Sequence, residues 1–113
     1  MRTLQKLTQR FCLGALAALT FGSALAADPG VTNEKLVLGA VIPLSGPPSI
    51  IGKAIATTLK VWEQDVNSRG GIGGRKVDIR IEDDGYVPQR AVQGLKKLID
   101  VEQIFALIGT SGS

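Results

Sequence analysis

Residues 35–42 have the sequence KLVLGAVI, which is apolar at nearly every position and rich in β-branched residues. A run of this kind is typical of a strand buried on both faces, as in a parallel sheet covered by helices. The next eight residues, PLSGPPSI at 43–50, contain three prolines and one glycine and therefore predict a loop. We expect a central parallel strand whose carboxyl end leads into this loop.

The sequence after the loop predicts an amphipathic helix over residues 52–68. Its apolar residues recur every three or four positions, which places them on one stripe of a helix. The stripe consists of Ile51, Ile55, Leu59, Trp62 and Val66. Trp62 could stack on a ligand, but its place on the stripe favours a position in the core. The glycines of RGGIGGR at 69–75 then end the helix.

Two further strands and a second helix follow. Residues 76–82, KVDIRIE, alternate between apolar and polar side chains, which predicts a half-exposed strand near a sheet edge. Pro88 suits the first turn of a helix that we expect to run to about Glu102. The apolar face of this helix is predicted to consist of Ala91, Leu95, Leu98 and Ile99. Residues 104–108, IFALI, are apolar throughout and predict a third strand, which GTSGS at 109–113 follows.

The predicted order is β-α-β-α-β, so the fold class is α/β, with three layers in which helices cover a parallel sheet. Ligands of such sheets bind beyond the carboxyl ends of the strands. Two loops leave these ends beside buried strands, at residues 43–51 and 109–113. They either line a binding site or are simple turns, and the pattern alone leaves both interpretations open.

Two glycine-rich stretches are similar to nucleotide-binding motifs without matching them. From Gly46 to Gly52 the spacing is one residue longer than a P-loop requires, and Ala54 stands where that motif has Ser or Thr. The run GGIGG at 70–74 lies after a helix and before a strand, the reverse of the order in a dinucleotide-binding fingerprint. We therefore expect no nucleotide and no other cofactor.

Asp83 and Asp84 form an acidic pair after the second predicted strand. They could ligate calcium or act as an acid pair, but no set of spaced oxygen ligands follows them. A role in the turn and in helix entry is favoured, because acidic residues suit the region before a helix N-terminus. No metal site is predicted.

The residues needed for several kinds of catalysis are missing. The sequence has no histidine, and its single cysteine is Cys12, which lies in the leader described below. This excludes Ser-His-Asp and Cys-His catalysis from the chain. A Ser-Lys pair stays open, although nothing in the sequence marks one, and we expect a binding protein and not an enzyme.

Residues 1–26 predict a cleavable secretory signal. The positive start consists of Arg2, Lys6 and Arg10, an uncharged apolar run follows at 11–21, and ALA at 24–26 supplies a small-residue exit. The apolar run is too short for a spanning helix, which needs about 20 residues. Cys12 matches no lipid-anchor signal. We expect cleavage before Ala27 and export to the periplasm.

The net charge of +3 belongs to this signal, which carries three of the 13 Lys and Arg residues and no acid. The rest of the chain has ten basic and ten acidic residues, so its formal charge is zero. A nucleic-acid-binding domain would carry a basic patch on its folded surface. We expect no nucleic-acid partner.

A succession of short motifs runs along residues 34–113. It consists of PLSGP at 43–47, Gly52, NSRGGIGGRK at 67–76, EDD at 82–84 with Pro88 and Ala91, and ALIG at 106–109 with Ser113 after it. This succession resembles the periplasmic branched-chain amino-acid (leucine/isoleucine/valine) binding proteins of ABC transporters. The resemblance implies the type I periplasmic binding protein fold, in which two α/β lobes joined by a hinge clamp a ligand, and it makes this chain the start of the first lobe.

The resemblance also implies which residues contact the ligand. Ser113, with Gly112 before it, would hold the backbone of an amino-acid ligand. Ile51 would pack near the ligand, and it is aliphatic where relatives often have an aromatic residue. Thr110 and Ser45 are weaker candidates on the same two loops.

We thus expect three segments: a signal peptide at 1–26, a flexible lead at 27–33, and a partial first lobe at 34–113 that is truncated relative to the family. The parent protein would bind an amino acid or a similar small molecule in the periplasm and present it to an ABC permease in the inner membrane. The alternatives are a ligand-binding sensor or receptor module of the same fold, or a non-functional truncated product.

Overall fold

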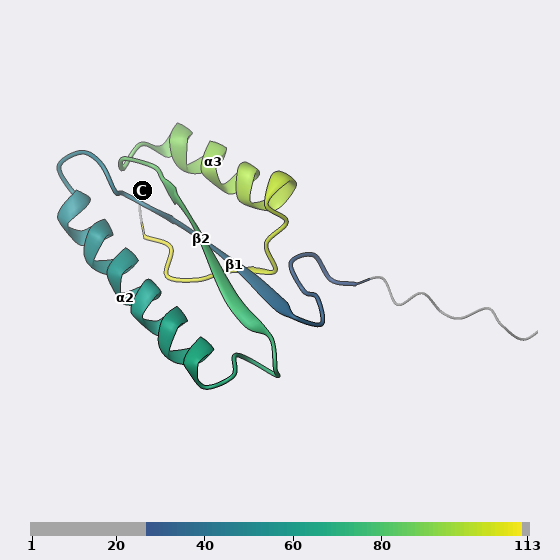
Figure 1. Cartoon of the computed structure of the whole chain (residues 1–113). Helices are drawn as coiled ribbons and strands as arrows, with labels where there is room; N and C mark the ends of the chain where they lie inside the picture. Colours follow the sequence, from purple (N-terminus) through teal and green to yellow (C-terminus); the bar gives the residue numbers. More distant parts are fainter. Residues whose placement is uncertain (1–26, 112–113) are drawn as a thin grey trace, which may run out of the picture.

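The computed structural model describes residues 27–111 (Figure 1). Its elements are β1 (Lys35–Ile42), α2 (Ser49–Ser68), β2 (Lys76–Asp83), α3 (Pro88–Lys96), a π-helical turn η1 (Lys97–Val101) and β3 (Ala106–Leu107). The expected signal peptide and two of the expected ligand contacts, Gly112 and Ser113, lie outside the described residues.

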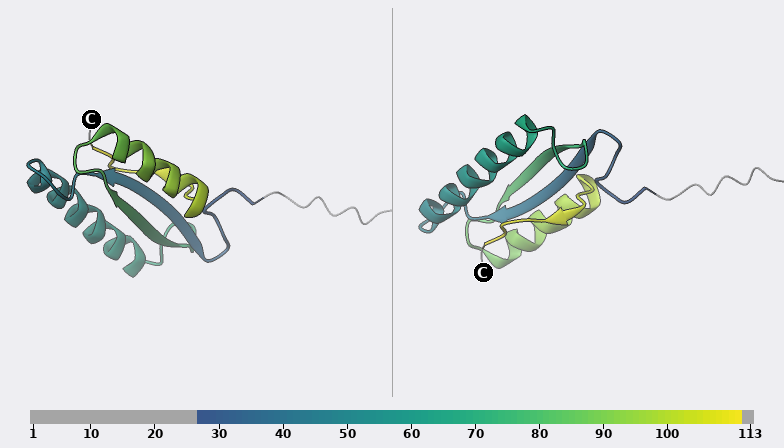
Figure 2. Two further views of the ribbon diagram at one scale, coloured as in Figure 1. Left: turned by 90° about the horizontal axis from the view of Figure 1, so that it is seen from above. Right: turned by 90° about the horizontal axis from the view of Figure 1, so that it is seen from below.

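The three strands form one parallel sheet in the order β2-β1-β3. The pairing of β1 with β2 is continuous from Lys35 opposite Lys76 to Ile42 opposite Asp83. Helix α2 covers one face of the sheet and α3 the other (Figure 2). The predicted α/β fold with three layers is confirmed, and β2 is the edge strand that its alternating sequence predicted.

Alternate residues of β1 serve the two faces of the sheet. Leu38 and Ala40 pack with Leu59 of α2, whereas Val41 packs with Leu98 on the α3 side. Both faces of β1 are therefore buried, which is why its sequence is apolar without alternation. Gly39 leaves space on the α3 side, because a Cβ there would lie 2.6 Å from the Cδ1 atom of Ile104.

Helix α2 packs through the predicted stripe, with one exception. Leu59 is buried, and Ile55, Trp62 and Val66 pack beside it against the sheet, so the core position of Trp62 is confirmed. Ile51, by contrast, has 59% of its surface exposed. The helix starts at Ser49, three residues before the predicted start, and its first turn lies past the carboxyl end of β1, where no strand remains to pack against.

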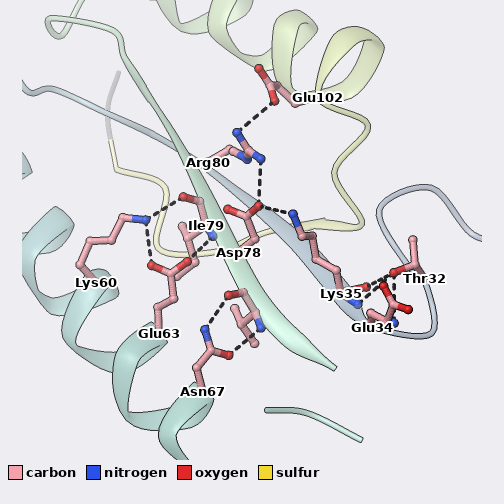
Figure 3. Close-up of polar contacts among 11 residues, drawn as sticks. Thr32, Glu34, Lys35, Lys60, Glu63, Asn67, Asp78, Ile79, Arg80 and Glu102 are labelled. Carbon is pink, nitrogen blue, oxygen red and sulfur yellow. Dashed lines mark hydrogen bonds and ion pairs between the residues drawn. The ribbon is translucent and has the colours of Figure 1, made fainter. Parts of the chain in front are cut away.

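The outer edge of β2 is occupied by three side chains of α2. Asn67 donates from Nδ2 to the carbonyl of Val77 and accepts from the Val77 N–H at Oδ1, both at 2.8 Å. Glu63 accepts from the Ile79 N–H at 2.8 Å, and Lys60 donates to the Ile79 carbonyl at 3.1 Å (Figure 3). An edge strand normally leaves such groups open to a further strand. Here the side chains of the helix take the place of that strand.

The second helix differs from its prediction after Lys96, where the α-helix gives way to the π turn η1. Ala91, Leu95 and Leu98 face the core as predicted, but Ile99 has 54% of its surface exposed, so its predicted place on the apolar face is wrong. The π turn has i→i+5 hydrogen bonds and is wider than an α turn. Its Glu102 N–H donates to the Lys97 carbonyl at 3.0 Å, and this wider turn carries Ile99 away from the face that Leu98 occupies.

Strand β3 is shorter than the predicted 104–108 and contains only Ala106 and Leu107. The reason lies in its hydrogen bonds to β1. Phe105, Ile108 and Ser111 donate their N–H groups to the carbonyls of Val37, Gly39 and Val41, at 2.8, 2.8 and 3.2 Å. The chain thus advances three residues for every two of β1, which regular parallel pairing does not allow.

The segment before β1 is hydrogen-bonded to the sheet. Gly30 accepts at its carbonyl from the Val37 N–H at 2.8 Å, and Arg75 donates from Nε to the Thr32 carbonyl at 2.6 Å. A Cβ at Gly30 would collide with the backbone nitrogen of Phe105, so the segment also lies against the chain just before β3. The flexibility expected for 27–33 stays a prediction.

Candidate ligand-binding site

Three loops emerge at the carboxyl edge of the sheet, after β1, β2 and β3, because all three strands are parallel (Figure 1). The chain moves from β1 to β2 on one side and then returns past β1 to β3 on the other side. In sheets of this order, ligands bind at the switch point outside the carboxyl ends of β1 and β3. The carboxyl edge is therefore the candidate site.

The loop after β1 is held by Asp83, the last residue of β2. Its Oδ1 atom accepts hydrogen bonds from the backbone N–H groups of Leu44 at 2.8 Å, Ser45 at 3.1 Å and Gly85 at 2.8 Å. Its Oδ2 atom pairs with Arg90 at 3.2 Å. The Ser45 hydroxyl, together with these N–H groups, holds the pKa of Asp83 well below its usual range, although burial opposes the shift. The side chain is thus a carboxylate that fixes one loop to the next.

The same loop is pressed against the start of α2. A Cβ at Gly52 would collide with the carbonyl of Pro43, so only glycine permits this approach. The first turn of α2 consequently projects Ile50 and Ile51 toward solvent, with 78% and 59% of their surfaces exposed. Ile51 is therefore free to contact a ligand, although it belongs to the helix and not to the loop.

The turn after β2 is organised by Asp84, which is only 1% exposed. Its Oδ1 atom accepts from the Tyr86 N–H at 2.8 Å, and its carbonyl accepts from the Val87 N–H at 3.0 Å. Helix α3 then begins at Pro88. The predicted role of the acidic pair in the turn is confirmed, whereas its role in helix entry stays a prediction, since no side chain in the described part of the chain caps the start of α3. Within residues 27–111, no group of three or more acidic, His or Cys side chains could hold a metal ion.

The loop after β3 lies against the end of β1. The Val41 N–H donates to the Thr110 hydroxyl at 3.4 Å, and the Ser111 N–H donates to the Val41 carbonyl at 3.2 Å. Thr110 also lines a groove of about 320 Å³ between α3 and β3, where Asp84 is the other polar residue. The remaining lining residues are Val41, Ala91, Val92, Leu95 and Leu107.

Two of the expected site residues thus lie on opposite sides of the β1 end, Ser45 on the β2 side and Thr110 on the β3 side. Ile51 lies in the first turn of α2, which follows the loop that carries Ser45. Tyr86 was not among the expected site residues; it lies on the loop after β2, at the same edge, in a left-handed backbone conformation with φ of 62°. The signal that could have indicated it is a tyrosine directly after Asp-Asp-Gly, where a turn is expected.

A parallel sheet whose order reverses at β1, with its loops gathered at the switch point, is the arrangement found in ligand-binding α/β domains. The chain belongs to the periplasmic binding protein family, whose sequence profile matches residues 35–113. None of the helices within residues 27–111 is long and apolar enough to cross a membrane.

Individual relatives are binding and transport proteins. The Leu/Ile/Val-binding protein homolog 7 of Brucella suis biovar 1 (strain 1330) is 28% identical over 91 residues, which are 80% of this chain and 23% of the relative. A solved fatty acid ABC transporter substrate-binding protein from Thermomonospora curvata is 32% identical, with a TM-score of 0.62 over 70% of this chain and 20% of that one. An extracellular ligand-binding receptor from Verminephrobacter eiseniae ef01-2 is 26% identical, with a TM-score of 0.66 over 70% of this chain and 22% of that one.

The chain therefore spans about a fifth of the length of these relatives. The solved relatives have the type I periplasmic binding protein fold, which the motif succession predicted. The part that matches here is the β-α-β-α-β unit that carries the three loops of the carboxyl edge.

Proposed function

We propose that this chain forms the opening part of the first lobe of a substrate-binding protein that serves an ABC importer. The ligand is a small carboxylate with an apolar side chain, of which a branched-chain amino acid is the first candidate. Relatives named for Leu, Ile and Val binding and for fatty acids support this choice, because their ligands share a carboxylate and an apolar part. The role is binding, without catalysis.

The observation that carries the proposal is the contact between the third loop and the end of β1. Thr110 and Ser111 are both hydrogen-bonded to Val41, close to the end of β1. The last described residue, Ser111, therefore lies at the switch point. Gly112 and Ser113 follow directly in the sequence. The proposal gives the Ser113 hydroxyl and the neighbouring main chain the role of holding the charged end of the ligand, while Ile51 contacts its apolar part.

Export and partner complete the proposal. The signal at 1–26 is removed before Ala27, the protein acts in the periplasm, and the loaded protein docks on an inner-membrane permease. Lobe closure about a hinge holds the ligand. Expression in a Gram-negative host tests the first step, because the periplasmic product should begin Ala-Asp-Pro. A product that keeps Met1 and stays in the cytosol contradicts it.

Isothermal titration calorimetry tests the binding itself, on the full-length protein, meaning this chain continued to the length of its relatives. The probes are L-leucine, L-isoleucine, L-valine and octanoate, with L-lysine as the control ligand. We expect one of the apolar probes to bind with micromolar or tighter affinity and lysine to bind at least a hundredfold more weakly. A folded protein that binds none of the apolar probes contradicts the proposal.

A sensor is the second candidate, supported by the extracellular ligand-binding receptor among the solved relatives. It uses the same ligand site and differs in its partner, which is a signalling protein and not a permease. The sequence downstream of codon 113 distinguishes the two. A membrane-spanning segment after the second lobe favours the sensor, whereas neighbouring permease and ATPase genes favour the importer.

A further inference from the structure

Tyr86 occupies a backbone conformation that disfavours its side chain. Its φ of 62° lies in the left-handed region, which bulky residues adopt rarely and which glycine or asparagine adopt readily. The conformation is imposed by Asp84, whose buried carboxylate accepts from the Tyr86 N–H at 2.8 Å. The turn would therefore form as well or better with Asn or Gly at this position.

The ring of Tyr86 adds little to the packing of the domain. The residue has 53% of its surface exposed, and it belongs to neither of the two clusters that form the core. An aromatic residue that strains the backbone and stays exposed is not explained by folding. Strain of this kind concentrates at functional sites, where the surrounding structure holds it in place.

The turn that carries Tyr86 adjoins the loop after β1. A Cβ at Gly85 would lie 3.1 Å from the Ser45 hydroxyl, and a Cβ at Gly46 would lie 3.4 Å from the Gly85 carbonyl. Asp83 joins the same two loops, since it accepts from both Ser45 and Gly85. Tyr86 thus stands at the carboxyl edge, one residue away from direct contact with the first loop.

We infer that Tyr86 is a ligand-contacting residue, which places its ring against the apolar part of the ligand and so helps to select ligands with an apolar side chain. This inference rests on the proposed function. The ring supplies a large apolar surface at small cost in conformational entropy, and its hydroxyl can hydrogen-bond to water at the exposed end. Ile50 and Ile51, in the first turn of α2, are further exposed large apolar residues that follow a strand at this edge.

The test compares three variants of the full-length protein with the wild type. Y86N removes the ring but keeps a residue that tolerates the left-handed turn. Y86F keeps the ring. V61N is the matched control, because Val61 is about as exposed as Tyr86 and lies on α2, far along the helix from the carboxyl edge. Calorimetry with L-leucine, L-isoleucine, L-valine and octanoate gives the affinities, and urea denaturation without ligand gives the unfolding midpoints.

We expect Y86N to bind the best apolar probe at least tenfold more weakly, with an unfolding midpoint that is unchanged or higher. Y86F and V61N should stay within threefold of the wild-type affinity. An unchanged affinity in Y86N overturns the inference and leaves the proposed function standing. A lower unfolding midpoint in Y86N also overturns it, because the ring would then serve the fold. A wild type that binds none of the probes overturns both.

Discussion

The Asp83 carboxylate accepts a hydrogen bond from the backbone N–H of Ser45 at 3.1 Å, and this bond joins the end of β2 to the loop after β1. The same oxygen accepts from Leu44 and Gly85. The shape of the first loop at the candidate site is therefore set by a side chain almost forty residues further along the chain. Loss of that side chain would free both loops at once.

Asp83→Ala is expected to lower the free energy of unfolding of the full-length protein by about 2–3 kcal/mol, because three N–H groups lose a charged acceptor. The side chain is 28% exposed, so water replaces part of the loss. Urea denaturation measures the change. The control is Asp65→Ala, which removes an exposed ion pair with Arg69 and should change the free energy by at most about 0.5 kcal/mol. Equal effects of the two variants would show that Asp83 does not hold the loops.

Stability is expected to fall as the pH is lowered below about 5. The pKa values of Asp83 and Asp78 are both lowered in the folded protein, Asp83 chiefly by the Ser45 hydroxyl and Asp78, against its burial, by Lys35 and Arg80. A lowered folded pKa gives stabilisation that is present above the unfolded value of about 3.9 and is lost as the pH falls through the folded value. Unfolding midpoints between pH 2 and 7 measure this, and Asp83→Ala should flatten the acid side of the curve. If the unfolding midpoint of Asp83→Ala fell equally steeply with decreasing pH, groups other than Asp83 would cause the loss of stability.

Asn67→Ala is expected to open the outer edge of β2. The N–H and the carbonyl of Val77 would lose their partners, at a cost of about 1–3 kcal/mol for groups left partly buried. Hydrogen exchange should show faster exchange at the Val77 amide, and sedimentation should show more self-association. Gln64→Ala, at an exposed position of the same helix, is the control and should change neither. Slow exchange at Val77 in Asn67→Ala would mean that the helix shields the edge without this bond.

The chain over residues 27–113 is expected to be poorly stable as a monomer and to associate through β3. This strand pairs with β1 on one side only, and Phe105 and Leu107 are about half exposed. Leu107→Lys should reduce the association, because a charge on an edge disfavours pairing. Val61→Lys is the control for added charge alone. Sedimentation at low concentration decides the matter, and a cooperatively folding monomer would contradict the expectation.

Ser113→Ala is expected to weaken ligand binding by the full-length protein by about one to two powers of ten. One hydrogen bond to a charged group contributes roughly 1.5–3 kcal/mol, and each power of ten corresponds to about 1.4 kcal/mol. Ser111→Ala is the neighbouring control, since its main-chain bond to Val41 does not need the hydroxyl. Ile51 substitutions should instead change which apolar side chain is preferred. Calorimetry that finds the same affinity after Ser113→Ala would exclude the serine from the site.

The sequence predicted those parts of the fold that depend on local pattern. The bounds of β1 were predicted in full, because a strand buried on both faces leaves an uninterrupted apolar run at 35–42. The start of α2 was missed by three residues, since Pro48 precedes it and no capping side chain marks it. β3 is short because its chain advances three residues for every two residues of β1. This mismatch involves two segments far apart in the sequence, so it leaves no local pattern.

The candidate site was predicted less completely than the fold. Parallel strands placed the loops of Ser45 and Thr110 at one edge, as the strand order alone requires. Asp83 was predicted as a turn residue, but its bonds to Leu44 and Ser45 join segments far apart in sequence. The left-handed conformation of Tyr86 depends on the buried carboxylate of Asp84, and burial of a charged residue is not visible in composition.

Because α2 side chains bond to the outer edge of β2, the order in which the strands are synthesised affects where a later strand can pair. Chains fold from the amino-terminal end as they are made, so β1, α2 and β2 are available before any later strand. Once Lys60, Glu63 and Asn67 are hydrogen-bonded to Val77 and Ile79, the outer edge of β2 offers a later strand fewer open backbone groups than the free edge of β1 does. Residues 35–83 thus form a one-sided template, which favours growth of the sheet on the β1 side, where β3 is found.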